Sequence, residues 1–514
     1  MSDYSTANMA NPVVDYYRKH LPTRNRIRRY SPATILEIAT YLLRTKADEG
    51  LGNKPTYLPW IIMLIIRWTY QYGDTAARRE ITEPEFNQIY NEIYSLGDGI
   101  RFEGQDTSNV FESFFRRTLF HQLPFQLSIN DVGTGLSRQM VMFCELGQPY
   151  GIEQEFERIT GLTASIFLEL YFACWACLKA GNPIWLDLGK YAQLYPNNEV
   201  ARFYELLAKD FANAQAFIRD YTANPNKVER KNIQYQINEH TPLERYPLYK
   251  TNGRYMPYSI MLFNNAMLNN MCDIFKADNP NFSSTSFGKI FESYVGKGVA
   301  LACSDFIAED ELKKLVPKNS KVADFLVRED NAAIIIEAKS TEQHEVARIY
   351  QTKEALLFNI KSNPIFKSLL QVITTAHHLK AAGHLKPENR VFALIPTYKD
   401  YLIGPPRNFW DNIIGEEMTR KLQELGLTNH ISPEDIFYVS IADFDYLMAG
   451  AAETGVSIGT LLAQIVERNR SPETMGIMLN QHLKTIWRLY YRPPYLDASL
   501  DKCAKSIERR FANA

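Results

Sequence analysis

The segment that most constrains the fold is a run of five apolar residues, Ala332 to Ile336, followed directly by Glu337, Ala338 and Lys339. A continuously apolar run of this length is typical of a central strand that is buried on both faces. Because side chains alternate along a strand, Glu337 and Lys339 project to the same face. A carboxylate and an amine at such a strand end cost free energy unless they are paired or bind something. The run therefore predicts a buried sheet with a charged site at one end.

A second carboxylate lies in another predicted strand, shortly before this run. Asp324 is part of the segment 322–327, and a hairpin turn over residues 328–331 would bring it beside Glu337. Two neighbouring carboxylates repel each other, and a divalent cation such as Mg²⁺ or Mn²⁺ relieves that repulsion. Lys339 could then orient a metal-bound water or offset charge on a phosphorane-like transition state. The alternative is a solvated salt bridge at the end of a strand.

A third carboxylate lies on a predicted amphipathic helix over residues 286–300, where the apolar residues recur at helical spacing. Glu292 is at the border of the apolar face, from where it could reach the sheet. A glutamate at the edge of the exposed surface is the alternative. Glu292 is therefore a candidate metal ligand, and the alternative of a surface glutamate stays open.

The periodicity of the chain changes near residue 220. Before this point, apolar residues recur at spacings of three and four, which predicts helices. Residues 221–259 carry several prolines and the turn signal Asn252-Gly253, and a further helix follows. Strand-like segments at 322–327, 332–340, 390–398 and 435–444 then alternate with helices, and helices return after residue 470.

These changes define the predicted domains. A length of 514 residues suits two to four domains of about 150 residues each. We predict a helical N-terminal domain (1–220), a connector with a hairpin and a helix (221–280), an α/β domain (281–470) and a C-terminal helical segment (471–514). The predicted fold class is α+β overall, with a mixed central sheet in the α/β domain.

The order of these elements resembles the PD-(D/E)xK nuclease superfamily, whose restriction-endonuclease-like core is a helix, a three-strand meander, a helix and a further strand. The helix of Glu292, the strands of Asp324 and of Glu337-x-Lys339, a later helix and the strand at 390–398 follow that order within residues 281–445. The resemblance implies that Asp324 and Glu337 bind the metal and that Lys339 assists the attacking water. It also implies that Glu292 is an accessory ligand.

Two positions depart from the pattern of that superfamily. Ala323 stands where the name of the superfamily has proline. On the following helix, Gln371 is a candidate accessory residue, but Thr375 stands where the RecB-like branch has a tyrosine four residues later. The branch to which the chain would belong is therefore left open.

Three shorter motifs suit other chemistry less well. Residues 455–459 match the G-x-S-x-G of serine hydrolases, but the preceding residues have the composition of a helix or a loop instead of a strand. Cys174 and Cys177 form a C-x-x-C without the second cysteine pair that a zinc site of this kind needs. His344-Glu345 lacks the second histidine of a zinc-protease helix.

The net charge of −1 carries no whole-chain signature of nucleic-acid binding, so any basic surface must be local. Two local clusters combine basic and aromatic residues, which suits contact with a phosphate backbone and unpaired bases. Ordinary exposed helix faces explain these clusters equally well. Their basic members are Arg24, Arg26, Arg28, Arg29, Lys484, Arg488 and Arg492.

The cellular compartment is predicted from cysteine content and apolar segments. Six cysteines are too few for a disulfide framework, and the N-terminus lacks the apolar segment of a signal peptide. The most apolar run, residues 59–68, is interrupted by Arg67 well short of a membrane span. We expect a cytoplasmic protein without membrane contact.

Together, these features predict a deoxyribonuclease that uses Mg²⁺ or Mn²⁺. No residue excludes RNA as the substrate instead of DNA. A weaker hypothesis is a role in prokaryotic restriction or anti-phage defence, with a protein partner or a second copy bound by the helical N-terminal domain. The alternative is a non-catalytic nucleic-acid-binding or assembly subunit, in which the nuclease-like fold is a scaffold.

Overall fold

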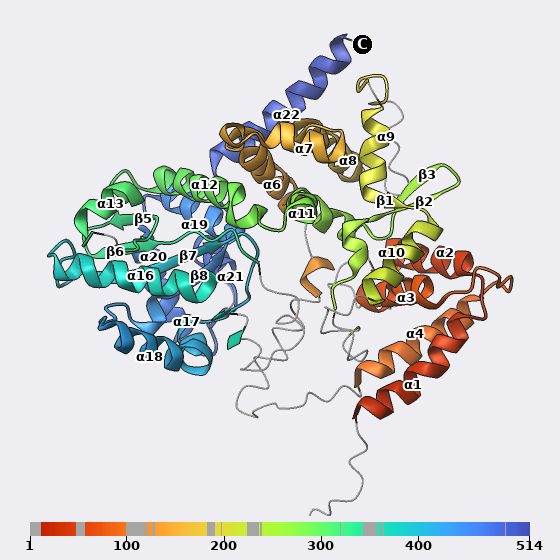
Figure 1. The fold of residues 1–514 in the computed structure, drawn as a ribbon, viewed down its shortest axis with the longest axis horizontal. Coiled ribbons are helices and arrows are strands. Elements are labelled where there is room, and N and C mark those ends of the chain that lie inside the picture. The colour runs from red at the N-terminus through yellow and green to blue at the C-terminus, as the bar shows by residue number, and fades with distance from the viewer. Residues whose placement is uncertain are drawn as a thin grey trace, which may run out of the picture.

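The structure of the protein is a computed structural model. It describes residues 12–47, 57–98, 119, 122–125, 129–181, 191–196, 198–223, 236, 239–318, 320–342, 357–358, 360–361, 364–488 and 490–513. Within these residues, helices and two small mixed sheets form an α+β fold, as the sequence predicts (Figure 1).

The larger sheet has five strands in the order β4-β5-β6-β7-β8. The strands are β4 (Phe306–Ala308), β5 (Phe325–Arg328), β6 (Ala332–Ile336), β7 (Arg390–Thr397) and β8 (Ile436–Ser440). β4, β5 and β6 are antiparallel neighbours, whereas β7 and β8 join β6 in parallel, so the sheet is mixed. The predicted hairpin between β5 and β6 is therefore confirmed, and β6 is buried along its whole length.

Helices cover both faces of this sheet (Figure 1). One face packs against α12 (Ser286–Ala302), α19 (Ile441–Thr454) and α20 (Ile458–Asn469). The other face packs against α16 (Pro364–Ala381), α17 (Pro406–Phe409) and α18 (Gly415–Leu425), and α13 (Glu309–Leu315) follows β4. Two helical layers explain why the strands are apolar on both faces.

Three predicted strands are shorter than expected. The segment 322–327 forms a strand only from Phe325, and the segment 332–340 forms a strand only to Ile336. The segment 435–444 has strand-like composition, but β8 ends at Ser440 and α19 begins at Ile441. The Ser440 side chain accepts a hydrogen bond from the backbone N–H of Asp443 (3.1 Å), which caps the first turn of α19. The prediction was wrong for residues 441–444 because this cap outweighs the local strand propensity.

The first part of the chain is helical, as predicted. Its helices are α1 (Pro12–Ile27), α2 (Pro32–Leu42), α3 (Pro59–Tyr72), α4 (Glu83–Asp98), α6 (Ile129–Gln139), α7 (Ile152–Thr160), α8 (Ala164–Lys179), α9 (Glu199–Leu207) and α10 (Phe211–Ala223). Helices α1 to α4 and α10 enclose a hydrophobic core of their own, which we call the N-terminal core; its buried members lie at residues 27–96 and 214–262.

A hairpin follows the helices of the first part. β2 (Leu248–Thr251) and β3 (Arg254–Pro257) are antiparallel, and Asn252 and Gly253 form the turn with φ of 47° and 73°. Positive φ at both turn residues suits a two-residue hairpin, which explains the preference for Asn-Gly. β1 (Ala208–Lys209) adds a third strand, parallel to β2, and α11 (Ile260–Asp278) is the predicted helix after the hairpin.

A second core, which we call the central core, contains buried side chains from residues 132–208 and from residues 248–507. It crosses the predicted domain boundary at residue 220. Within it, Arg138 of α6 donates to the buried Asp445 of α19 (2.7 Å), and Tyr294 of α12 donates to the same carboxylate (2.9 Å). Helices α6 to α9 therefore pack with the helices of the large sheet.

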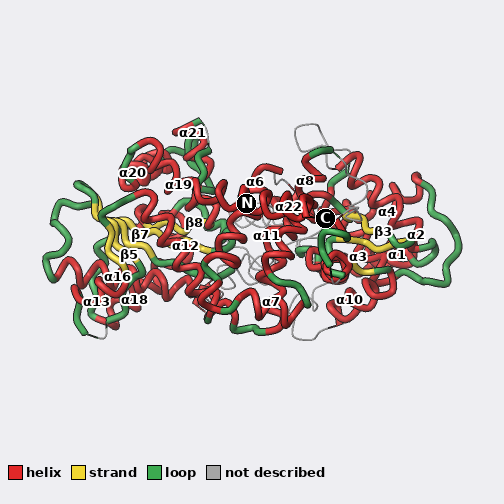
Figure 2. Tube along the Cα trace, turned by 90° about the horizontal axis from the view of Figure 1, so that it is seen from above, coloured by secondary structure: helices red, strands yellow, loops and turns green. Residues whose placement is uncertain are grey.

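The C-terminal segment is helical, as predicted, with α21 (Leu479–Trp487) and α22 (Pro494–Asn513). α22 returns to the first part of the chain, where Arg510 donates to Glu169 of α8 (3.1 Å). Figure 2 shows the two sheets at opposite ends of the molecule, with α6, α8, α11 and α22 between them. Among the described residues, no single helix is long and apolar enough to cross a membrane.

Candidate active site

Strand register brings the predicted site residues together. Phe325 of β5 pairs with Ala308 of β4 on one side and with Ile336 of β6 on the other. Continuing the register of β5 and β6 by one residue sets Asp324 opposite Glu337. Directly opposite residues of antiparallel strands project to the same face, with Cβ atoms about 4.5–5.5 Å apart. Glu309, which the sequence interpretation did not select, begins α13 directly after β4 at the same end of the sheet. We call Glu309, Asp324 and Glu337 the carboxylate row.

Hydrogen bonds tie the two central carboxylates to their neighbours. The Lys339 ammonium group donates to Oε1 of Glu337, and the side-chain amide of Gln371 donates to Oε2 (3.0 Å). The backbone N–H of Ala338 donates to Oδ2 of Asp324 (2.7 Å). Thus three of the predicted residues and the accessory Gln371 form one connected group around Glu337 and Asp324.

Helix α16 supports this group from one face of the sheet. Gln371 also donates to the carbonyl oxygen of Val322, and the buried Thr375 hydroxyl accepts from the backbone N–H of Ala323 (2.9 Å). One helical turn separates Gln371 from Thr375, so both side chains face the segment that leads into Asp324. A threonine at position 375 therefore has a structural role where the RecB-like branch has a tyrosine.

Burial dominates the electrostatics of the site. Glu337 has no exposed surface and Asp324 is 8% exposed. Burial raises the pKa of Glu337 to about 8; the charge of Asp324 adds to the rise, and Lys339 opposes it. Burial also raises the pKa of Asp324 to about 6, with Lys339 and the Ala338 N–H opposing the rise. With a pKa of about 8, Glu337 keeps a proton near neutral pH, and a cation bound by the pair would displace that proton.

Two further carboxylates border the row, each beside a lysine. Glu292 of α12 is 27% exposed and accepts from Lys289 (2.8 Å). Glu309 is 28% exposed and lies 3.1 Å from the Lys313 ammonium group. The charges of Glu292 and Glu309 both contribute to the raised pKa of Asp324, which places them within electrostatic reach of the site.

The donor set suits a hard divalent cation. Mg²⁺ commonly binds through one or two carboxylates plus water and substrate phosphate, so Asp324 and Glu337 are a sufficient protein contribution. Among the described residues, no group of three or more His, Cys, Asp or Glu side chains is arranged to hold a metal ion. Glu292 is therefore a bordering carboxylate in this structure, and its role as an accessory ligand stays a prediction.

The predicted basic clusters lie elsewhere. Figures 1 and 2 show α1, which carries Arg24 and Arg26, at the opposite end of the molecule from the large sheet. Arg26 pairs with Glu92 of α4 (2.9 Å). Arg28 and Arg29 follow α1 and are exposed.

The second basic cluster surrounds the end of α21. The Lys484 ammonium group lies 5.8 Å from the ring centroid of Tyr490, and Arg492 lies 3.4 Å from Asp497. Arg488 is exposed and adopts a left-handed conformation with φ of 61° directly after α21. Contact of either basic cluster with nucleic acid stays a prediction.

The other motifs take structural positions. Ser457 caps α20, and the residues before it belong to α19, so no strand leads into the G-x-S-x-G segment. Cys174 and Cys177 lie on α8, and residues 344–348 lie outside the described residues.

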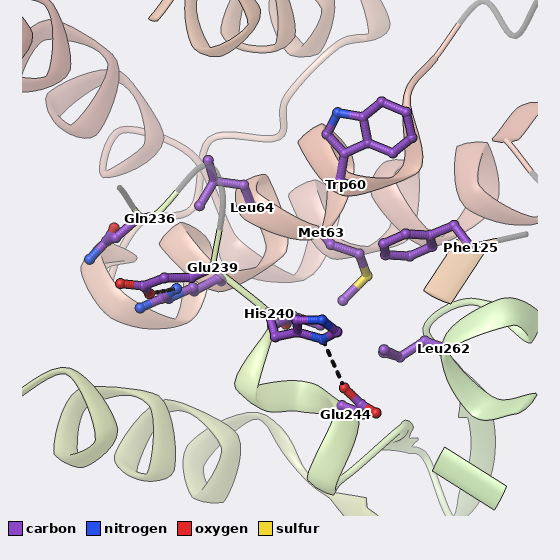
Figure 3. A pocket seen from close by; sticks show the side chains of 11 residues that line it. Trp60, Met63, Leu64, Phe125, Gln236, Glu239, His240, Glu244 and Leu262 are labelled. Carbon is purple, nitrogen blue, oxygen red and sulfur yellow. Dashed lines mark hydrogen bonds and ion pairs between the residues drawn. The ribbon is translucent and has the colours of Figure 1, made fainter. Parts of the chain in front are cut away.

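A small cavity lies in the N-terminal core (Figure 3). Trp60, Met63 and Phe125 line one part of it, and Glu239 and His240 line another. Its volume of about 20 Å³ is enough for about one water molecule. This cavity is therefore too small to be a substrate site.

No family model matches the chain, and no curated protein or solved structure shows significant similarity to it. The functional conclusion therefore depends on the geometry around Asp324, Glu337 and Lys339.

Proposed function

We propose that the protein is a divalent-metal-dependent nuclease that hydrolyses phosphodiester bonds in DNA, with a PD-(D/E)xK-like catalytic domain at residues 281–470. The observation that carries this proposal is the convergence of Asp324, Glu337 and Lys339 at one end of a buried mixed sheet. Buried carboxylates with raised pKa values beside a lysine are more typical of functional sites than of exposed salt bridges.

Each residue has a definite task in this proposal. Asp324 and Glu337 would hold Mg²⁺ or Mn²⁺, with Glu292 as an accessory ligand. The bound cation would supply Lewis acidity and a more acidic water. Lys339 orients the attacking water and offsets negative charge that develops on the phosphate. Gln371 positions Glu337, because its amide donates to the carboxylate and to the backbone at Val322.

The test is a cleavage assay with supercoiled plasmid, linear duplex, single-stranded DNA and RNA, each with Mg²⁺, Mn²⁺ or EDTA. We expect cleavage by the wild type that EDTA abolishes and that Lys339→Ala reduces at least about 100-fold. Lys314→Ala is the matched control, because Lys314 is an exposed lysine whose partner is Glu311. Circular dichroism would confirm that both variants are folded.

Two outcomes would contradict the proposal. Equal cleavage by the wild type and Lys339→Ala would show that another site or a contaminant is responsible. No cleavage of any substrate, together with no Mn²⁺ binding that Asp324→Ala removes, would favour the alternative of a non-catalytic scaffold. Cleavage of RNA alone would correct the substrate and retain the chemistry.

Restriction or anti-phage defence is the proposed biological setting. Its support is an analogy at the level of the fold, because a nuclease domain joined to a large helical part suits a sensor joined to an effector. A partner or a second copy bound by the helical part stays part of the proposal. Protection of expressing cells against some member of a phage panel is the expected result, and a lack of protection in every case would contradict the setting.

A further inference from the structure

A polar cleft lies at the end of α3, between α1 and α10, at the opposite end of the molecule from the carboxylate row. Its volume of about 450 Å³ falls within the range of about 300–1,000 Å³ that is usual for small-molecule sites. Arg24 and Arg28 line it from the end of α1, and Arg219 lines it from α10. Three guanidinium groups thus meet in one cleft from distant parts of the sequence.

Within the described part of the chain, the arginines of this cleft outnumber its carboxylates. Among the described residues, no carboxylate lies within ion-pair distance of Arg24, Arg28 or Arg219, whereas Arg26 on the same helix pairs with Glu92. Asp74 is the acidic residue that lines the cleft, and its Oδ1 accepts from the backbone N–H of Ala76 (2.8 Å). The lining therefore carries three positive charges and one negative charge.

The carbonyl end of α3 explains the position of Arg219 but not those of Arg24 and Arg28. Arg219 donates to the carbonyl oxygens of Gln71 (3.3 Å) and Gly73 (3.4 Å), and Gln215 donates to the latter (3.2 Å). These contacts satisfy the carbonyl end of the helix, which attracts cations. Arg24 and Arg28 make no such contact in the described structure; the Arg24 guanidinium donates instead to Oδ1 of the neighbouring Asn25 (3.4 Å). The helix end therefore accounts for Arg219 but not for Arg24 and Arg28.

We propose that this cleft binds the phosphate group of a nucleotide. Guanidinium groups match phosphate oxygens with paired hydrogen bonds, so Arg24, Arg28 and Arg219 suit a phosphate. The ring of Tyr72 also lines the cleft, with the Arg24 guanidinium 5.9 Å from its centroid, and a base can stack on an aromatic ring or on a guanidinium plane. Asp74 adds an acceptor that suits the hydroxyl groups of a sugar and repels a bare anion. The inference does not depend on the nuclease proposal.

The test is isothermal titration calorimetry of the full chain in EDTA, which keeps metal–nucleotide complexes away from Asp324 and Glu337. The probes are AMP, ADP, ATP, inorganic pyrophosphate and a 5′-phosphorylated single-stranded oligonucleotide. We expect at least one nucleotide probe to bind more tightly than pyrophosphate. We also expect about 10- to 100-fold weaker binding in Arg24→Gln and Arg28→Gln, the loss of one charge-assisted hydrogen bond each.

Arg26→Gln is the matched control, because Arg26 lies on the same helix but faces Glu92, and its binding should equal that of the wild type. Arg28 is exposed, so weaker binding in Arg28→Gln cannot be attributed to misfolding. Binding of the oligonucleotide alone would assign the site to a strand terminus, and binding of free nucleotides would assign it to a small ligand. Three results would overturn the proposal. The first is that no probe binds, and the second is that Arg26→Gln loses as much binding affinity as Arg24→Gln and Arg28→Gln. The third is that pyrophosphate binds as tightly as the nucleotides.

Discussion

The N-terminal core and the large sheet both bury charged side chains, but they balance the charges differently. In the N-terminal core, Arg67 donates to Glu239, and both side chains are only 3% exposed. At the end of the sheet, Asp324 and Glu337 share one lysine, whose side chain is 24% exposed. A matched buried pair specifies packing, whereas unmatched buried carboxylates with raised pKa values are typical of a site that binds something.

The largest expected effect tests the structural side of this comparison. Glu239→Ala removes a buried carboxylate that pairs with the buried Arg67, so we expect the free energy of unfolding to fall by about 3–5 kcal/mol. Chemical denaturation followed by circular dichroism would measure it. Glu311→Ala, which removes the exposed partner of Lys314, is the control and should cost at most about 1 kcal/mol. Equal effects in the two variants would show that the Arg67–Glu239 pair has no special role.

A smaller effect tests how α16 holds the site. Thr375→Val keeps the shape of the side chain but removes the acceptor for the buried N–H of Ala323. We expect a loss of about 1–3 kcal/mol in the free energy of unfolding. Thr374→Val is the matched control on the same helix, since the Thr374 hydroxyl donates to the carbonyl of Leu370 (2.7 Å) within α16 and to no other described residue. If the Thr374 variant loses as much stability as the Thr375 variant, the Ala323 contact does not hold the strand.

The pH dependence of stability tests the unmatched carboxylates. The pKa of Glu337 is raised from 4.5 to about 8, so between these values the folded protein binds a proton that the unfolded chain has lost. The free energy of unfolding must therefore fall as pH rises through this window, by at most about 1.4 kcal/mol per pH unit from this group. Glu337→Gln removes the titrating group. The free energy of unfolding of this variant, measured by chemical denaturation at pH 5, 6, 7 and 8, should therefore fall less steeply with rising pH. Parallel curves for wild type and variant would contradict the raised pKa.

The smallest expected effect separates positioning from folding. Gln371→Ala removes one donor from Glu337, so we expect a loss of stability of only about 0.5–1.5 kcal/mol. If the nuclease proposal holds, cleavage should fall about tenfold through kcat, because a displaced carboxylate affects the reaction more than substrate binding. Gln371→Glu should not restore the rate, since a third negative charge would repel Glu337. Full activity in Gln371→Ala would show that Gln371 has no positioning role.

Local patterns in the sequence predicted much of the large sheet. The apolar run before Glu337, the short turn after residue 328 and the alternation of side chains were enough to place Asp324, Glu337 and Lys339 together, because a hairpin joins neighbours in sequence. The Asn252-Gly253 turn was predictable for the same reason. Where two local signals competed, at residues 435–444, the capping serine began a helix inside the predicted strand.

The sequence by itself therefore determined most strands and helices, apart from the ends of some strands, and which charged residues stand at the end of a buried strand, because these depend on neighbours in the chain. Only the tertiary structure decided that Glu309 joins the carboxylate row and that Thr375 supports Ala323. It also decided that Arg219 meets Arg24 in one cleft. Those contacts join residues far apart in sequence, and no local periodicity encodes which distant surfaces pack together.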